Sequence, residues 1–264
     1  MSFLLYVPIW LMVIIVALLS VVVAYVGFYL IHRYYDYEHL EKYHNVTSYL
    51  FNAYGLLYAV LIAFVVFINW SDYNNAQNHI YSESNQISNL FFNVQGLDEP
   101  LRTNLLNSIC NYTEIINNIE IPEMQKGIYS YENNIAFNRI WEDFIKIDIK
   151  TINNTILYDK CMDELKGISE ARRFRYFYIT NSIPTIIWVV MILGCLISFS
   201  FSFFFGVRVR FPYFFLAIAF TFINVIILYL IYVLDHPYEG ANAISYHTMT
   251  KILENFRTVL QSPK

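Results

Sequence analysis

The chain is a series of long apolar stretches separated by polar ones. Four stretches contain no Asp, Glu, Lys or Arg, and they cover residues 3–31, 43–71, 176–207 and 211–234. Each is longer than the roughly 20 residues that an α-helix needs to cross a bilayer. The first is also far longer than the apolar core of a signal peptide, so we expect it to be retained as an anchor. The pattern predicts four transmembrane helices, at about 3–31, 48–70, 181–206 and 211–234.

The polar stretch between the second and third of these helices also has a helical pattern. Apolar residues recur every three or four positions, as at Leu101, Leu105 and Ile109, which is the spacing of one face of an amphipathic helix. Strand-like alternation is weak throughout, so we predict an all-α polytopic membrane protein with a helical extramembrane domain inserted between helices 2 and 3. The expected parts are helices 1 and 2 within 1–71, the domain at 72–175, helices 3 and 4 within 176–235, and a C-terminal tail at 236–264.

Composition supports a membrane protein and excludes several kinds of function. The chain is 57% hydrophobic and 14% charged, with a net charge of −4, whereas soluble domains average roughly 25% charged residues. It contains no phosphate-binding, dinucleotide-binding, nucleophile-elbow or zinc-protease motif, and no basic stripe for nucleic acid. We therefore expect no enzyme activity, cofactor, metal site or nucleic-acid partner. Pairing of Cys110 with Cys161 depends on the compartment and stays open.

The distribution of basic residues bears on the orientation in the membrane. Four spans place the N-terminus, the domain and the C-terminus on one side. The two short loops, at about 32–44 and 206–210, carry Arg33, Lys42, Arg208 and Arg210. The positive-inside rule then makes the loops cytoplasmic and the domain extracytoplasmic. A similar basic group on the domain side, including Lys166, nearly balances this count, so the opposite orientation stays open.

The end of the fourth span, "LIYVLDHPYEG", places Asp235 and Glu239 where a helix C-terminus disfavours anions. Pro237 ends the helix and Gly240 permits a tight turn. A positive partner is expected nearby, and "SEARRFRYF" brings three candidates to the same side: Arg172, Arg173 and Arg175. The acids and arginines are predicted to meet, either as a clamp between spans three and four or as an entrance for anions.

Polar and small residues within the spans suggest helix packing or a pore. Asn52 and Gly55 share one face of the second span with Ala59, and Asn224 lies near the middle of the fourth. Small residues let another helix approach closely, and a polar residue at this depth usually faces protein or water. Asn52, with Tyr54 and Tyr58 of the same span, is the expected pore lining if a pore exists. Spacing alone makes Glu83 an ordinary solvated residue.

The order of these features resembles the bestrophin-like family of uncharacterised bacterial membrane proteins. The resemblance runs from His44 to about Thr248 and rests on "HNVTSYLFNAYGLLYAVLIAFVVFINW", then Glu83, "EARRFRYF" and "LIYVLDHPYEG". It implies importance for Asn45, Gly55, Tyr58, Glu83, Arg172, Arg175, Asp235, Pro237 and Gly240. The family often has Arg where His236 stands and Phe where Tyr238 stands, so the resemblance gives His236 no essential role.

The family name implies likeness to bestrophins, which are oligomeric anion channels with four spans per subunit. The resemblance therefore implies a homo-oligomer in a bacterial inner membrane that conducts small ions, with anions expected. It also conflicts with the orientation argued above, because bestrophins hold the helical region in the cytoplasm. The alternative is a membrane scaffold or stress sensor that transports nothing and whose helical domain binds a partner protein.

Overall fold

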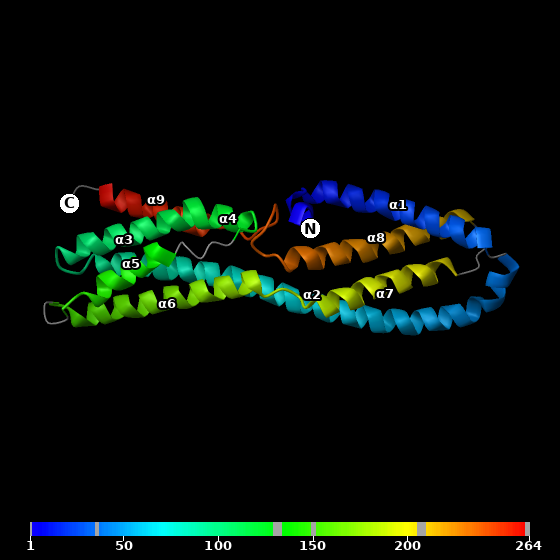
Figure 1. The fold of residues 1–264 in the computed structure, drawn as a ribbon, viewed down its shortest axis with the longest axis horizontal. Coiled ribbons are helices and arrows are strands. Elements are labelled where there is room, and N and C mark those ends of the chain that lie inside the picture. The colour runs from blue at the N-terminus through cyan, green and yellow to red at the C-terminus, as the bar shows by residue number, and fades with distance from the viewer. Residues whose placement is uncertain (1, 35–36, 129–133, 149–151, 205–209, 262–264) are drawn as a thin grey trace. The chain divides into compact units, whose positions relative to one another are not determined.

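The chain is helical in every regular element of its computed structural model, which describes residues 2–34, 37–128, 134–148, 152–204 and 210–261. The elements are η1 (Ser2–Tyr6), α1 (Ile9–Tyr34), α2 (Tyr37–Val94), α3 (Leu101–Ile115), η2 (Ile116–Glu120), α4 (Ile121–Gln125), α5 (Asn134–Ile145), α6 (Thr155–Thr180), α7 (Thr185–Phe203), α8 (Arg210–Leu234) and α9 (His247–Gln261) (Figure 1). Of these, α1, α2, α7 and α8 are long and apolar enough to cross a membrane. The predicted all-α class with four spanning helices is confirmed for the described residues.

The chain forms two compact units. The transmembrane unit comprises residues 3–72 and 182–236, and the helical domain comprises residues 73–181 and 237–264. The C-terminal segment, expected as a separate tail, therefore folds into the domain. Its helix α9 is amphipathic, and the ring of Phe256 on its buried face stacks on Phe91 of α2 with 3.8 Å between centroids. The sequence of α9 contains this apolar face, but the predicted domain ended at residue 175 and so left α9 out.

Helix α2 contributes to both units without a break. It has 58 residues, which at 1.5 Å per residue is about 87 Å of helix and far more than the roughly 30 Å hydrocarbon core of a bilayer. Only its charge-free part, within residues 43–71, can span the membrane, and the later part belongs to the domain. The expected loop at 32–44 was too long, because α2 is already helical from Tyr37 and no Pro or Gly interrupts its first turns.

The basic residues of the two expected loops have different positions. Arg33 lies in the last turn of α1, Lys42 lies in α2, and Arg210 begins α8. Arg208 falls outside the described residues. The sidedness argued from these charges stays a prediction.

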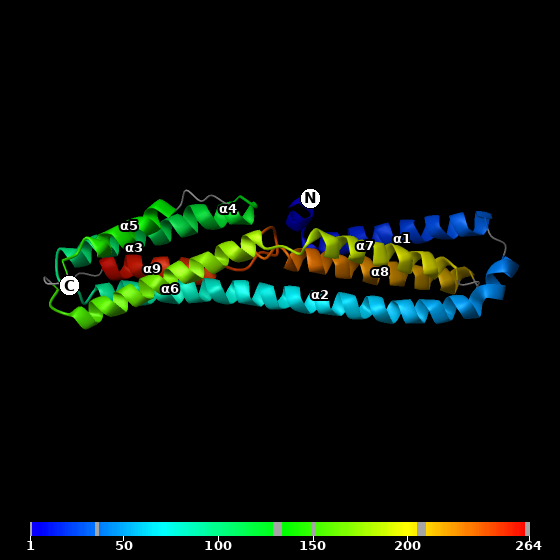
Figure 2. The same cartoon turned by 60° about the horizontal axis from the view of Figure 1, so that its bottom comes forward.

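Two tyrosines of α2 fix the packing of α7 in the transmembrane unit. The hydroxyl of Tyr54 donates to the carbonyl oxygen of Gly194 at 2.5 Å, and that of Tyr58 donates to the carbonyl oxygen of Met191 at 3.0 Å. A Cβ at Gly194 would overlap the ring of Tyr58, so glycine permits this close approach. Helices α1 and α8 also pack along each other in this unit, and α7 contacts α8 (Figure 2).

We predict that Gly194→Ala lowers the thermal stability of the purified protein in detergent. The added methyl group overlaps the Tyr58 ring, and overpacking of this kind typically costs about 1–3 kcal/mol. Gly55→Ala is the matched control, because nothing lies within 4 Å of a Cβ at that position. Unfolding midpoints that fall equally in the two variants would show that the contact of α2 with α7 does not depend on this glycine.

Candidate functional site

Four charged side chains lie together inside the helical domain. They are Glu83 on α2, Glu120 at the end of η2, and Arg172 and Arg175 on α6, and none is more than 7% exposed. We call this set the buried charge cluster. Charged side chains are almost never fully buried unless they are paired, so these four must satisfy one another.

Glu120 accepts from both arginines. Its Oε1 lies 2.8 Å from Nη2 of Arg172, and its Oε2 lies 2.8 Å from Nη2 of Arg175. The same Nη2 of Arg175 lies 3.2 Å from Oε1 of Glu83. The cluster therefore links three separate segments of the domain, and its formal charges cancel.

Aromatic side chains complete the surroundings of the cluster. Tyr112 of α3 donates its hydroxyl hydrogen to Oε1 of Glu83 at 3.0 Å. The guanidinium carbon of Arg172 lies 5.6 Å from the ring centroid of Tyr112 and 5.4 Å from that of Phe137. These are cation–π distances, so the aromatic faces stabilise a cation that burial has removed from water.

Local helix geometry delivers each of these groups. Arg172 and Arg175 are three residues apart and so share one face of α6. Glu120 ends a π-helical segment, which is uncommon and often found at functional sites. Pro122 explains the wider turn, because its ring would clash with the carbonyl of Asn118 in a regular α-helix.

Burial and charge shift the pKa values in this cluster. Burial raises the pKa of Glu83 and outweighs the opposing effect of Arg175. Its second oxygen, Oε2, is buried and has no hydrogen-bond partner among the described residues. For Arg175, burial disfavours the cation, but the carboxylates of Glu83 and Glu120 prevail and raise its pKa. Burial also raises the pKa of Tyr112 well above its usual value, so its hydroxyl stays a donor.

The acidic partners of the arginines differ from those predicted. Arg172 and Arg175 pair with Glu120 and Glu83 rather than with Asp235 and Glu239. The reason is that α6 continues to Thr180 and α7 begins only at Thr185. The arginines therefore lie inside the domain and not at the start of a span. Arg173, between them in sequence, is exposed.

Asp235 has a backbone partner. Its Oδ1 accepts from the N–H of Ile183 at 2.8 Å. Ile183 precedes Pro184 and lies in the non-helical link between α6 and α7, where no helical hydrogen bond uses this N–H. Asp235 therefore joins the segment before α7 to the end of α8, as in the predicted clamp between spans three and four, but its partner is a backbone N–H and not an arginine.

The turn after α8 follows the predicted chemistry. Gly240 has φ of +74°, a left-handed conformation that favours glycine, and its N–H donates to the carbonyl oxygen of Gln125 at 3.1 Å. The carbonyl oxygen of Pro237 accepts from Ile244 at 2.9 Å. The carboxyl group of Glu239 lies close to Gly127 of the domain. These contacts join the segment after α8 to the end of α4.

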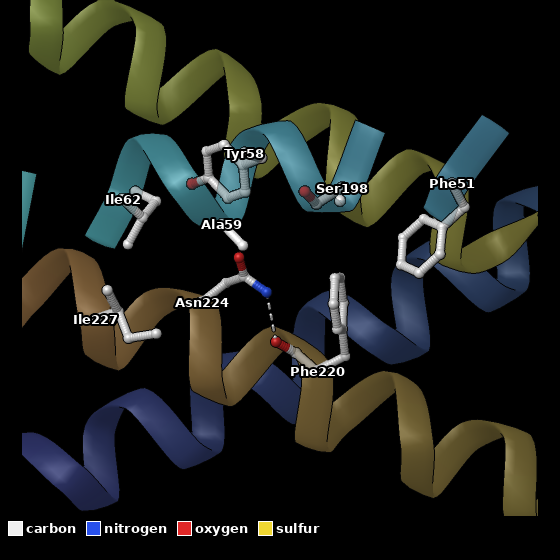
Figure 3. A pocket seen from close by; sticks show the side chains of 9 residues that line it. Phe51, Tyr58, Ala59, Ile62, Ser198, Phe220, Asn224 and Ile227 are labelled. Atoms are coloured by element: carbon white, nitrogen blue, oxygen red, sulfur yellow. Dashed lines mark hydrogen bonds between the residues drawn. The ribbon is translucent and has the colours of Figure 1, made fainter. Parts of the chain in front are cut away.

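Polar residues of the spans divide into an inner and an outer group. Tyr54 and Tyr58 face α7 within the protomer, as described above. Asn224 is partly buried and lines a cavity of about 240 Å³ between α2, α7 and α8 (Figure 3). Asn52, in contrast, is exposed on the protomer surface of the spanning part of α2.

Sequence reasoning missed Glu120 and the role of Tyr112. A signal for Glu120 was present, because it follows Ile116 by four residues and so continues the apolar stripe of α3 with a charge. Among the described residues, no group of His, Cys, Asp and Glu suits a metal ion, and Cys110 and Cys161 are free thiols.

We predict that Arg175→Met strongly destabilises the protein, because it leaves buried carboxylates without their cation. Breaking a buried ion pair from one side typically costs about 3–5 kcal/mol. Arg173→Met is the matched control on the exposed face of α6 and is expected to change stability by no more than about 0.5 kcal/mol. Thermal unfolding in detergent measures both variants. Equal midpoints would contradict a structural role for the cluster.

A second prediction concerns pH. Because the folded pKa of Glu83 is raised, the folded state binds this proton more readily than the unfolded state does. The stability gained is complete below the ordinary glutamate pKa and is lost as the pH rises through the raised value. Glu83→Gln lacks this contribution, so the stability of the natural protein relative to the variant should fall as the pH rises from acid to neutral. Unfolding midpoints across this range test it, and a constant or rising difference would contradict it.

Comparison with known proteins places this architecture in a family. A model of the Bestrophin-like domain matches residues 18–249. The structure of a bacterial bestrophin homologue from Klebsiella pneumoniae is similar, with a TM-score of 0.74 and 12% identity over 95% of this chain and 99% of that chain. A point variant of a bestrophin homologue from the same organism gives a TM-score of 0.75 and 11% identity over 95% and 99%.

Identities this low show a shared fold, which in these structures extends over nearly the whole chain. Curated protein sequences give no match. The family model alone covers most of the chain, from within α1 to beyond α8, the last helix that can span a membrane. The chain therefore belongs to the bestrophin-like family.

Proposed function

We propose that this protein assembles as a homo-oligomer in a bacterial inner membrane and conducts small ions along a path between subunits. The observation that carries the proposal is the exposure of Asn52 on the spanning part of α2. A carboxamide directed into lipid has no hydrogen-bond partner and is costly, whereas one that faces a neighbouring subunit or a water-filled path is satisfied. An assembly with the exposed face of α2 inward satisfies Asn52 in this way.

The rest of the site fits this proposal. We expect the buried charge cluster to be poorly suited to an ion entrance, since its arginines are almost fully buried and already paired. Tyr54 and Tyr58 bind the backbone of α7, so they are less suited to line a path than the sequence suggested. The exposed surface of α2 offers Asn52 beside large apolar side chains such as Leu56 and Leu57. Polar positions next to apolar constrictions are a common arrangement in channels.

Membership of the bestrophin-like family supports the same function, because the resemblance implies oligomeric channels. The preference for anions rests on that resemblance, and the amide hydrogens of Asn52 are suited to it because they can donate to an anion. The scaffold alternative predicts a protein that stays monomeric or dimeric and passes no ion.

We predict that the purified protein in liposomes mediates chloride flux, and that Asn52→Leu reduces this flux because it removes the polar group from the path. Asn224→Leu is the matched control, since the same substitution there alters a residue inside the protomer. Both variants should keep the oligomeric state of the natural protein in mild detergent. The proposal fails if neither anions nor sodium or potassium pass at any pH, or if the detergent-solubilised protein is a monomer.

A further inference from the structure

A cavity inside the transmembrane unit opens on the face of α2 that also carries Asn52. It lies within one protomer, has a volume of about 240 Å³, and is lined mainly by apolar and aromatic side chains that include Phe51, Tyr58 and Phe220 (Figure 3). Engineered apolar cavities of about 150 Å³ bind benzene. This cavity is therefore large enough for a substituted or two-ring aromatic molecule.

One polar atom in the cavity has no partner. The side-chain nitrogen of Asn224 donates to the carbonyl oxygen of Phe220 at 2.9 Å. Figure 3 shows the carboxamide oxygen of Asn224 directed across the cavity toward Ala59. No hydrogen bond reaches this oxygen from the described residues, and the hydroxyl of Tyr58 is already used by Met191. Among the described residues, the carboxamide oxygen of Asn224 is thus a free acceptor on a mainly apolar wall that also contains the hydroxyl of Ser198.

The surface of α2 gives the cavity an opening. Ala59, which lines it, is exposed, and the position of a Cβ at Gly55 has no atom within 4 Å. Since this part of α2 spans the membrane, molecules can reach the opening from the bilayer or from the proposed path between subunits. None of the described residues that line the cavity is charged, so an ion would lose its hydration without compensation.

We propose that this cavity is a binding site for a small aromatic molecule that carries one N–H or O–H donor and partitions into the membrane. The ring packs between Phe51, Tyr58 and Phe220, and the donor bonds to the side-chain oxygen of Asn224. This matches the usual design of small-molecule sites, in which an apolar pocket has a few polar groups that fix orientation. The proposal does not depend on ion conduction.

Indole and 1-methylindole form a suitable pair of probes, because they are similar in shape and only indole has an N–H donor. The measurement is the fraction of the natural protein in detergent that remains monodisperse after heating, at increasing probe concentration. Indole should raise the midpoint of thermal aggregation in a saturable way, and 1-methylindole should raise it less. Equal effects of the two probes, or none from either, would overturn the proposal.

Three variants test whether indole binds in this cavity. Asn224→Leu should remove the advantage of indole over 1-methylindole, whereas Asn52→Leu, on the outer surface of α2, should keep it. Ala59→Phe fills the cavity from its open side and should abolish the response to both probes, which provides a test if Asn224→Leu is not recovered folded. An indole advantage that persists in Ala59→Phe, or that is lost in Asn52→Leu, would assign the binding to another place and contradict the proposal.

Discussion

The pairing of two buried glutamates with two buried arginines is the interaction on which the helical domain depends. These charges are almost fully buried, so each carboxylate requires a cation and each guanidinium requires a carboxylate. Glu120 satisfies both arginines at once, and Glu83 accepts from Arg175 and from Tyr112. The partners come from α2, α3, η2 and α6, so these four elements must hold one arrangement for the cluster to exist. Apolar side chains such as Ile80, Ile87 and Ile168 form the core around the cluster and also stabilise the domain.

The cluster also has consequences outside the domain. Helix α2 continues from Glu83 back into its charge-free spanning part without a break. Helix α6 leads from Arg175 to the link before α7, where Asp235 holds the N–H of Ile183. Arg172 and Arg175 therefore neutralise buried carboxylates, and Asp235 just after α8 makes a backbone contact. The function proposed for the protein therefore rests on the outer surface of α2.

Much of the fold followed from the sequence, because the signals for it are local. A charge-free stretch longer than a bilayer predicts a spanning helix whatever its neighbours do, and apolar residues at helical spacing predict a packing face. The partners of the arginines were not local. Glu120 and Glu83 are separated from Arg175 by 55 and 92 residues, and only the packing of α2, η2 and α6 brings them together. Pro122 indicates a distortion of the helix before it, but the position of Glu120 relative to α6 could not be predicted without the neighbouring helices. The spacing around Glu83 predicted an ordinary solvated side chain, and only the family resemblance indicated that this residue is important.

The central claim is that the buried charge cluster is structural and takes no part in ion conduction. Replacement of all four members by apolar residues of similar size tests it most directly, with the substitutions Glu83→Met, Glu120→Met, Arg172→Leu and Arg175→Met made together. Apolar replacement of a whole buried ion network is often neutral or stabilising, whereas removal of one member is not. The account predicts that the fourfold variant unfolds at a higher temperature than Arg175→Met alone and keeps the ion flux of the natural protein in liposomes. A fourfold variant that is folded and oligomeric but passes no ions, or one no more stable than Arg175→Met, would contradict it.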